Sequence, residues 1–122
     1  MPAEVKRSVR VAARIKEELA QLLVTEVRDP RIVGVLVSRV EMPDDLRGAR
    51  VYFRMLEGGD DKGRREEALT GLGRASGMLR REIANRLGLK FAPDFRFYYD
   101  VQQDKVDRIE TLLEEVKREK KP

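Results

Sequence analysis

The spacing of apolar residues switches between a helical and a strand period along the chain, and this alternation limits the possible folds more than any other feature. Residues 5–27 repeat apolar side chains every three or four positions, which predicts an amphipathic helix. Residues 33–42 and 49–56 are rich in β-branched and alternating apolar residues, which predicts two strands. The short polar link between them predicts antiparallel pairing.

The second half of the chain repeats the switch. Residues 64–87 have helical spacing and end before Gly88, which we expect to cap the helix. Three glycines interrupt the pattern, and each costs about 1 kcal/mol relative to alanine inside a helix. They are Gly71, Gly73 and Gly77. We therefore predict a break or kink there. Residues 93–100 predict a third strand, and residues 105–117 a last helix.

The predicted fold class is α+β, in the order helix, strand, strand, helix, kink, helix, strand, with an additional C-terminal helix. All the helices, including the last one, are expected to cover one face of a three-stranded sheet. Strict alternation in the first strand places Leu36, Val40 and Met42 on one face, and Val35 and Val37 on the other. We expect one domain over residues 1–117, followed by a short basic tail, residues 118–122.

Composition restricts the chemistry. The 122 residues include no His and no Cys, so imidazole bases, thiolates and the usual zinc ligands are absent. The carboxylate pairs lie in turns and at helix ends, where catalytic carboxylates are not expected. We therefore expect no enzyme, no catalytic residue, no metal and no cofactor. No segment approaches the roughly 20 apolar residues of a membrane span, no signal peptide is evident, and a cytoplasmic protein is expected.

Basic residues gather where the predicted kink lies. The net charge is +4, and small residues at a helix junction allow another backbone to approach closely. The candidate RNA-binding residues are Arg74, Ala75, Ser76, Gly77, Arg80, Arg81, Arg86 and Lys90, with a second group at Arg10, Arg14 and Lys16. Helix N–H dipoles and arginines would bind phosphate together. The alternative is a kinked helix with a solvated basic face. We interpret Tyr52, Tyr98 and Tyr99 as sheet packing rather than as base-stacking sites.

Seven segments in order along the chain carry a further signal: Arg10–Ala20, Glu26–Arg31, Val40–Leu46, Ala49–Tyr52, Ala75–Gly77, Phe95–Asp100 and Arg108–Leu113. Together they resemble, over nearly the whole chain, the family of the bacterial small-subunit assembly factor called ribosome-binding factor A. The resemblance implies a KH-like domain of type II topology, with an Ala-x-Gly kink at Ala75–Gly77. It also implies a protein that binds the free or immature 30S subunit and its 16S rRNA, and assists late 30S maturation and 16S rRNA processing.

Two other functions stay open from the residues alone. One is a generic KH-type RNA-binding module without a ribosomal target. The other is a small protein-interaction domain whose helices dock a partner. No exposed apolar face is evident in the sequence, which favours a monomer.

Overall fold

The elements follow the predicted order. The computed structural model describes residues 5–120, apart from the side chains of Asp104 and Lys120. Its elements are α1 (Arg7–Thr25), the 3-10 turn η1 (Pro30–Ile32), β1 (Val35–Glu41), β2 (Gly48–Met55), α2 (Lys62–Leu87), β3 (Asp94–Tyr99) and α3 (Val101–Lys120). The α+β prediction is confirmed: three α-helices accompany a three-stranded sheet in the described residues.

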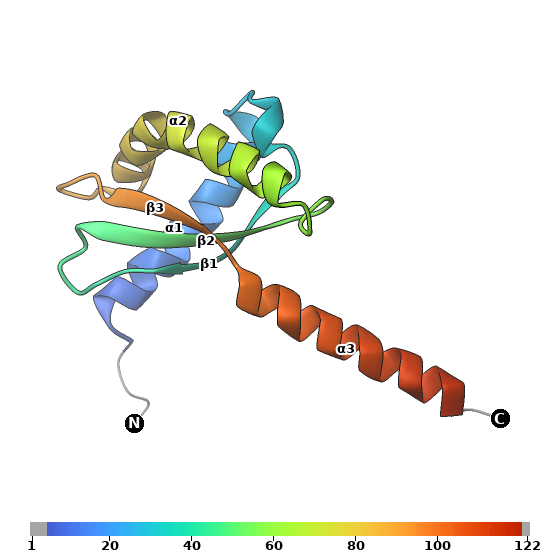
Figure 1. Cartoon of the computed structure of the whole chain (residues 1–122). Helices are drawn as coiled ribbons and strands as arrows, with labels where there is room; N and C mark the ends of the chain where they lie inside the picture. Colours follow the sequence, from blue (N-terminus) through green and yellow to red (C-terminus); the bar gives the residue numbers. More distant parts are fainter. Residues whose placement is uncertain (1–4, 121–122) are drawn as a thin grey trace.

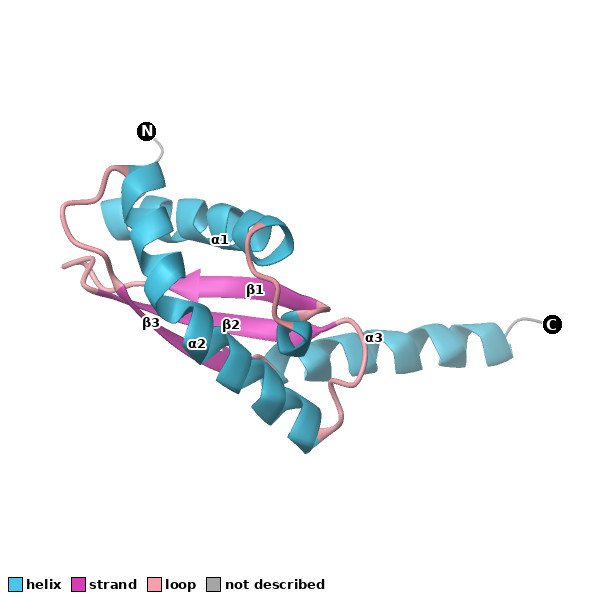
Figure 2. Cartoon of the chain, turned by 90° about the horizontal axis from the view of Figure 1, so that it is seen from above, coloured by secondary structure: helices cyan, strands magenta, loops and turns pink. Residues whose placement is uncertain are grey.

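The sheet has the strand order β1-β2-β3. Strands β1 and β2 pair antiparallel, as predicted, whereas β2 and β3 pair parallel because α2 carries the chain back between them. Helices α1 and α2 lie against one face of the sheet, and no helix formed by residues 5–120 lies over the middle of the other face (Figures 1 and 2). The sheet therefore has one covered face and one open face.

The core lies between the covered face and the two helices. Strand β2 alternates as predicted, with its inward side chains buried from Ala49 to Met55 and Phe53 completely inaccessible. The buried residues form two clusters. One contains Ile15, Leu19, Leu22, Ala49, Val51, Leu79, Ile83 and Phe95, and the other contains Ile32, Phe53, Met55, Ala68 and Leu72. Both helices thus bury their apolar stripes against the same strands.

Strand β1 contains a β-bulge that the alternation did not predict. The pairing register shifts between Val37 and Arg39, which leaves Ser38 as an extra residue. Val37 and Val40 consequently both pack against the core, and Leu36 lies 43% exposed. The predicted division of this strand into two faces is therefore wrong, because one inserted residue inverts every later side chain.

Helix α2 is continuous from Lys62 to Leu87, so the predicted break into two helices is wrong. One of the glycines has a packing role: a Cβ at Gly71 would lie 3.2 Å from Asp29 Oδ2 and 3.3 Å from Arg31 Cβ. The glycine therefore lets η1 approach the helix closely. The predicted cap is confirmed, since Gly88 adopts a left-handed conformation with a φ of 63°.

Helix α3 runs away from the rest of the molecule (Figure 1). Its first half is tied down by two ion pairs, Arg54–Asp107 and Arg108–Asp60. Its apolar stripe is not buried: Val106, Ile109, Leu112, Leu113 and Val116 are all 45–59% exposed. The expectations that the last helix covers the sheet and that no apolar face is exposed are therefore both wrong.

The helix continues to Lys120, so it includes the start of the predicted tail at residues 118–122. Residues 121 and 122 lie outside the described part of the chain. None of the helices within residues 5–120 has both the length and the apolar composition needed to cross a membrane.

Candidate nucleic-acid interface

The outward side of α2 carries a row of glycines and arginines, which we call the α2 ridge: Gly73, Arg74, Gly77 and Arg81. Three of them recur every fourth residue, so they lie on one side of the helix. All four are exposed. A Cβ built at Gly73 or Gly77 meets no atom within 4 Å. Backbone is therefore accessible along this side of the helix.

The two ridge glycines have no packing role within the described residues, in contrast to Gly71. Each costs about 1 kcal/mol relative to alanine in a helix interior, and no internal contact offsets that cost. A partner that approaches the helix backbone closely would account for both glycines. At the ridge, the sequence therefore lowers the stability of the helix without an internal contact that compensates, and such local conflicts are typical of binding sites.

The two ridge arginines are available to a partner. Neither Arg74 nor Arg81 forms an ion pair or a side-chain hydrogen bond within the described residues. A guanidinium in this state can bind a phosphate through two parallel hydrogen bonds. The ridge therefore combines close backbone access with phosphate-binding groups.

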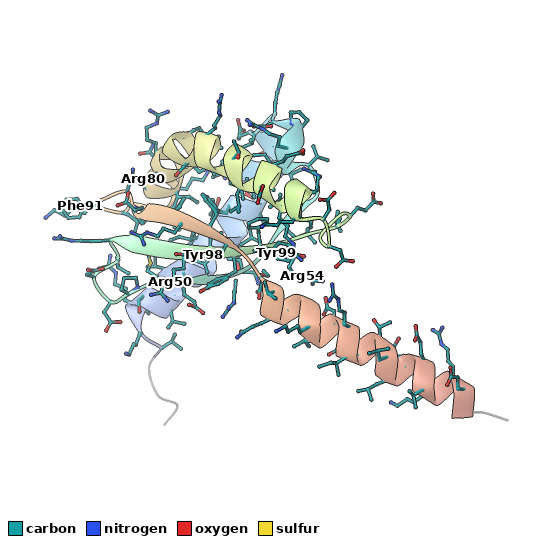
Figure 3. The ribbon with its side chains drawn as sticks, viewed as in Figure 1. Arg50, Arg54, Arg80, Phe91, Tyr98 and Tyr99 are labelled. Carbon is teal, nitrogen blue, oxygen red and sulfur yellow. The ribbon has the colours of Figure 1, made fainter. Side chains whose placement is uncertain are left out.

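Arg80, also predicted to bind RNA, is used inside the fold. Its Nε donates to the carbonyl oxygen of Pro93 at 3.0 Å, and its Nη2 donates to that of Ala92 at 3.3 Å. The same Nη2 lies 3.1 Å from Asp94 Oδ1. These contacts hold the loop between α2 and β3, at the end of the sheet where Phe91 also lies (Figure 3).

Arg86 joins α2 to α1. Its Nη1 lies 2.8 Å from Glu18 Oε2, and its Nε lies 3.7 Å from Glu82 Oε2. The hydrogen bond to Glu18 and the surrounding acids raise the pKa of Arg86 above its usual value, against the opposing effect of burial. The structure therefore gives both Arg80 and Arg86 structural contacts, and we leave them out of the interface.

The three other residues predicted to bind RNA in and after α2 lie in different environments. Ala75 packs against both core clusters and faces the sheet. Ser76 is half-buried. Lys90 is exposed in the loop after α2, with its Nζ 5.5 Å from the ring centre of Phe91, which is itself 60% exposed. Of the three, only Lys90 offers a charge to a partner.

The first-helix residues lie on two different sides of α1. Arg14 lies 4.0 Å from Glu18, the residue that also pairs with Arg86, so this side of α1 meets α2. Arg10 precedes Arg14 by one turn on the same side. Lys16 instead lines a groove between α1 and β1. Arg10 and Arg14 therefore share the side of α1 whose Glu18 contacts α2, and Lys16 lies apart from them.

The sequence interpretation missed the open face of the sheet, where Tyr52 and Tyr98 lie with their ring centres 5.5 Å apart. Both rings belong to strands whose inward residues are core, and the period alone does not reveal that no helix covers them. The alternation of Arg and Tyr in residues 50–54 and 96–98 was the available signal.

A buried carboxylate organises one end of this face. Asp100 is 3% exposed and accepts hydrogen bonds from Ser38 Oγ at 2.7 Å and from the Gln103 N–H at 3.1 Å. Arg39 Nε lies 3.4 Å away. Burial opposes the charge of Asp100, but these hydrogen bonds and the arginine outweigh it and keep its pKa below the usual value. The bulge at Ser38 thus places a hydroxyl on the carboxylate that begins α3.

Comparison with known proteins identifies close relatives. The family described as Ribosome-binding factor A matches residues 7–113. The protein of that name from Sorangium cellulosum is 50% identical over 117 residues, covering 96% of this chain and 94% of the relative. The one from Geobacter sulfurreducens is 42% identical over 114 residues, covering 93% of this chain and 94% of the relative.

Solved structures agree with the sequence match. The solution structure of a putative ribosome-binding factor A from Thermotoga maritima is 34% identical, has a TM-score of 0.65, and covers 80% of this chain and 91% of that one. A homology model of the Thermus thermophilus factor, fitted into the cryo-EM map of a 30S complex, is 25% identical with a TM-score of 0.60, and covers 75% of this chain and 92% of that one. Sequence and fold together place this chain in the ribosome-binding factor A family.

Proposed function

We propose that this protein binds the free or immature 30S ribosomal subunit through 16S rRNA and assists late 30S maturation and 16S rRNA processing. The observation that carries the proposal is the α2 ridge, where two exposed glycines without a packing role alternate with two arginines that have no ion pair within residues 5–120. The 30S complex of the related Thermus factor supports the choice of a ribosomal target.

In the proposed mechanism, Arg74 and Arg81 bind phosphates of the rRNA and release the counterions that those phosphates hold. Gly73 and Gly77 let the sugar–phosphate backbone approach the helix. Arg10, Arg14 and Lys90 add positive charge nearby. The same proposal takes the fold as KH-like, with α2 as its RNA-binding helix.

The protein would act by binding and release, as a cytoplasmic monomer without chemistry of its own. The absence of His and Cys from the sequence supports a role that needs neither imidazole nor thiolate. Binding and release also require an affinity that conditions can reverse, and phosphate contacts provide one because they weaken steeply with salt.

The test is co-sedimentation of the full chain with purified immature 30S subunits on sucrose gradients. We expect the double variant Arg74→Glu, Arg81→Glu to lose binding by at least about tenfold, since each substitution replaces a phosphate contact by repulsion. The matched control is Arg28→Glu with Lys62→Glu, which changes the same total charge at two exposed residues outside the ridge.

Wild-type-like co-sedimentation of the Arg74, Arg81 variant would remove the ridge from the interface. A second comparison separates the ribosomal target from a generic RNA-binding module. The factor should prefer immature 30S subunits over free rRNA fragments, whereas a generic module should bind both equally well.

A further inference from the structure

The open face of the sheet carries a row of one arginine and two tyrosines, one residue from each strand, which we call the aromatic row. The pairing register places Arg39 beside Tyr52, and Tyr52 beside Tyr98. The Arg39 guanidinium carbon lies 3.9 Å from the ring centre of Tyr52, and the two tyrosine rings are inclined by 31°. Tyr98 remains 40% exposed. Tyr52 is thus covered by Arg39, and Tyr98 offers an aromatic surface to solvent.

A second row, two residues further along the strands, carries adjacent like charges. Arg50 and Arg96 are paired in the parallel register and are both exposed. Like charges placed side by side on neighbouring strands destabilise a sheet. Glu41 shares the row, but its carboxylate lies closer to Arg39, at 2.7 Å, than to Arg50, at 3.9 Å. Arg96 forms no ion pair within residues 5–120.

These two arginines also line a hollow at the β1–β2 turn, together with Arg47. The acids that line the hollow are Glu41 and Asp94. Each of them has a closer basic partner elsewhere: Glu41 has Arg39, and Asp94 has Arg80 at 3.1 Å. Three guanidiniums therefore surround a concave site whose carboxylates are already paired, which is the charge pattern of a site for an external anion.

The aromatic row and the arginine row lie about 6.6 Å apart, from a rise of about 3.3 Å per residue. A flat ring surface next to a site for phosphate matches a nucleotide whose base is unstacked. Duplex RNA does not offer such a base, because its bases are stacked inside the helix. An acidic peptide would use the arginines but would gain nothing specific from the ring.

We propose that the open sheet face binds single-stranded RNA, with a base stacked on Tyr98 and phosphates in the hollow at Arg47, Arg50 and Arg96. The inference deepens the proposed function and rests on it for the choice of RNA as the polymer. The surface is separate from the α2 ridge, since α2 lies on the opposite side of the sheet (Figures 2 and 3). Helix α3 bounds it at the far end, through Arg54 and Asp107.

The test is fluorescence anisotropy with a labelled 12-nucleotide single-stranded RNA and the full chain. Tyr98→Ala should weaken binding about fivefold to a hundredfold, the range of one base stacked on an aromatic ring. Tyr98→Phe keeps the ring and should bind like wild type. Arg50→Glu with Arg96→Glu should weaken binding by about tenfold or more and reduce the slope of log K against log salt by about 1.4, for two phosphates on a single strand.

The matched control is again Arg28→Glu with Lys62→Glu, which should change oligonucleotide binding far less than the Arg50, Arg96 pair does. Equal affinity of Tyr98→Ala and wild type would overturn the inference. So would equal or tighter binding of duplex RNA or polyglutamate by the wild-type protein. The substituted side chains are exposed, and an unchanged melting temperature verifies that each variant folds.

Co-sedimentation with immature 30S subunits, run beside these titrations, separates this inference from the proposed function. If the Arg74, Arg81 variant loses the subunits while Tyr98→Ala binds the oligonucleotide normally, the inference fails and the function stands. If the wild-type protein does not co-sediment with the subunits but binds the oligonucleotide through Tyr98, the proposed function is wrong and the RNA-binding role of the open face is supported.

Discussion

The two faces of strand β2 are made by alternate residues of one short segment, yet they have opposite roles. On the covered face, Phe53 lies inaccessible between the sheet and two helices. On the open face, Arg50 is exposed to solvent and lies 3.9 Å from Glu41. The apolar core is built on the covered face, which leaves positions such as Arg50 on the open face available to carry charge and aromatic rings for binding.

The largest expected effect comes from the covered face. Phe53→Ala should lower the free energy of unfolding by about 3–5 kcal/mol, because it opens a cavity in a packed core. Arg50→Ala, three residues away on the open face, should change it by no more than about 0.5 kcal/mol. Urea unfolding measures both. Similar losses for the two variants would contradict the division of roles between the faces.

A smaller loss is expected where the open face meets α3. Asp100→Ala removes the closer acceptor of the Ser38 hydroxyl, which keeps only the Tyr52 carbonyl oxygen at 3.2 Å, and it removes the charge beside Arg39. The loss should be about 1–3 kcal/mol. Ser38→Ala removes a hydroxyl that Asp100 and the Tyr52 carbonyl oxygen share, while it leaves the Asp100 charge beside Arg39, and it should cost about 1 kcal/mol. If Asp100→Ala unfolds at the same urea concentration as wild type, the network does not stabilise the bulge.

Acid should destabilise the folded protein through carboxylates that lie outside the covered face. Hydrogen bonds from the Arg31 side chain and backbone lower the pKa of Asp29 to about 2, and the pKa of Asp100 is also lowered. Because both folded-state pKa values lie below the unfolded values, their stabilisation is complete above about pH 4 and is lost as pH falls towards 2. Thermal unfolding from pH 6 to pH 2 measures this loss. Asp29→Asn should lose less stability over that range than wild type, and an identical decline would contradict the assignment.

The smallest effect is expected on α3, whose apolar stripe resembles those of α1 and α2 but belongs to neither core cluster and stays about half exposed. Ile109→Ser with Leu113→Ser should change the free energy of unfolding by no more than about 0.5 kcal/mol. Leu72→Ala in α2 should cost about 2–5 kcal/mol, because Leu72 is completely buried. Comparable losses would mean that α3 contributes to the core after all.

Much of the fold could be predicted because its signals are local. The period of the apolar residues identified the helices and strands, and Gly88 marked the end of α2. The bulge at Ser38 could not be predicted, since an inserted residue is defined only by its partner strand. The apolar stripe on α3 led to the wrong prediction that this helix covers the sheet. Amphipathic spacing shows that a helix can be buried on one side, but the tertiary structure decides whether it is.

The candidate site was predictable in outline and not in detail. Basic residues near the glycines indicated the correct helix, but helical spacing did not distinguish Arg81, which faces solvent, from Arg80, which hydrogen-bonds the loop before β3. The glycines indicated a kink when read by propensity alone. Their role became apparent only when one was found against η1 and the other two against open solvent.

The most direct measurement of the central claim substitutes the ridge glycines, Gly73→Ala with Gly77→Ala. The added methyl groups meet nothing inside the fold, so the double variant should gain up to about 2 kcal/mol in unfolding free energy, at about 1 kcal/mol each. If rRNA approaches the helix backbone along this ridge, the same stabilised variant should bind immature 30S subunits more weakly than wild type on sucrose gradients. A more stable variant that binds the subunits as tightly as wild type would contradict the account.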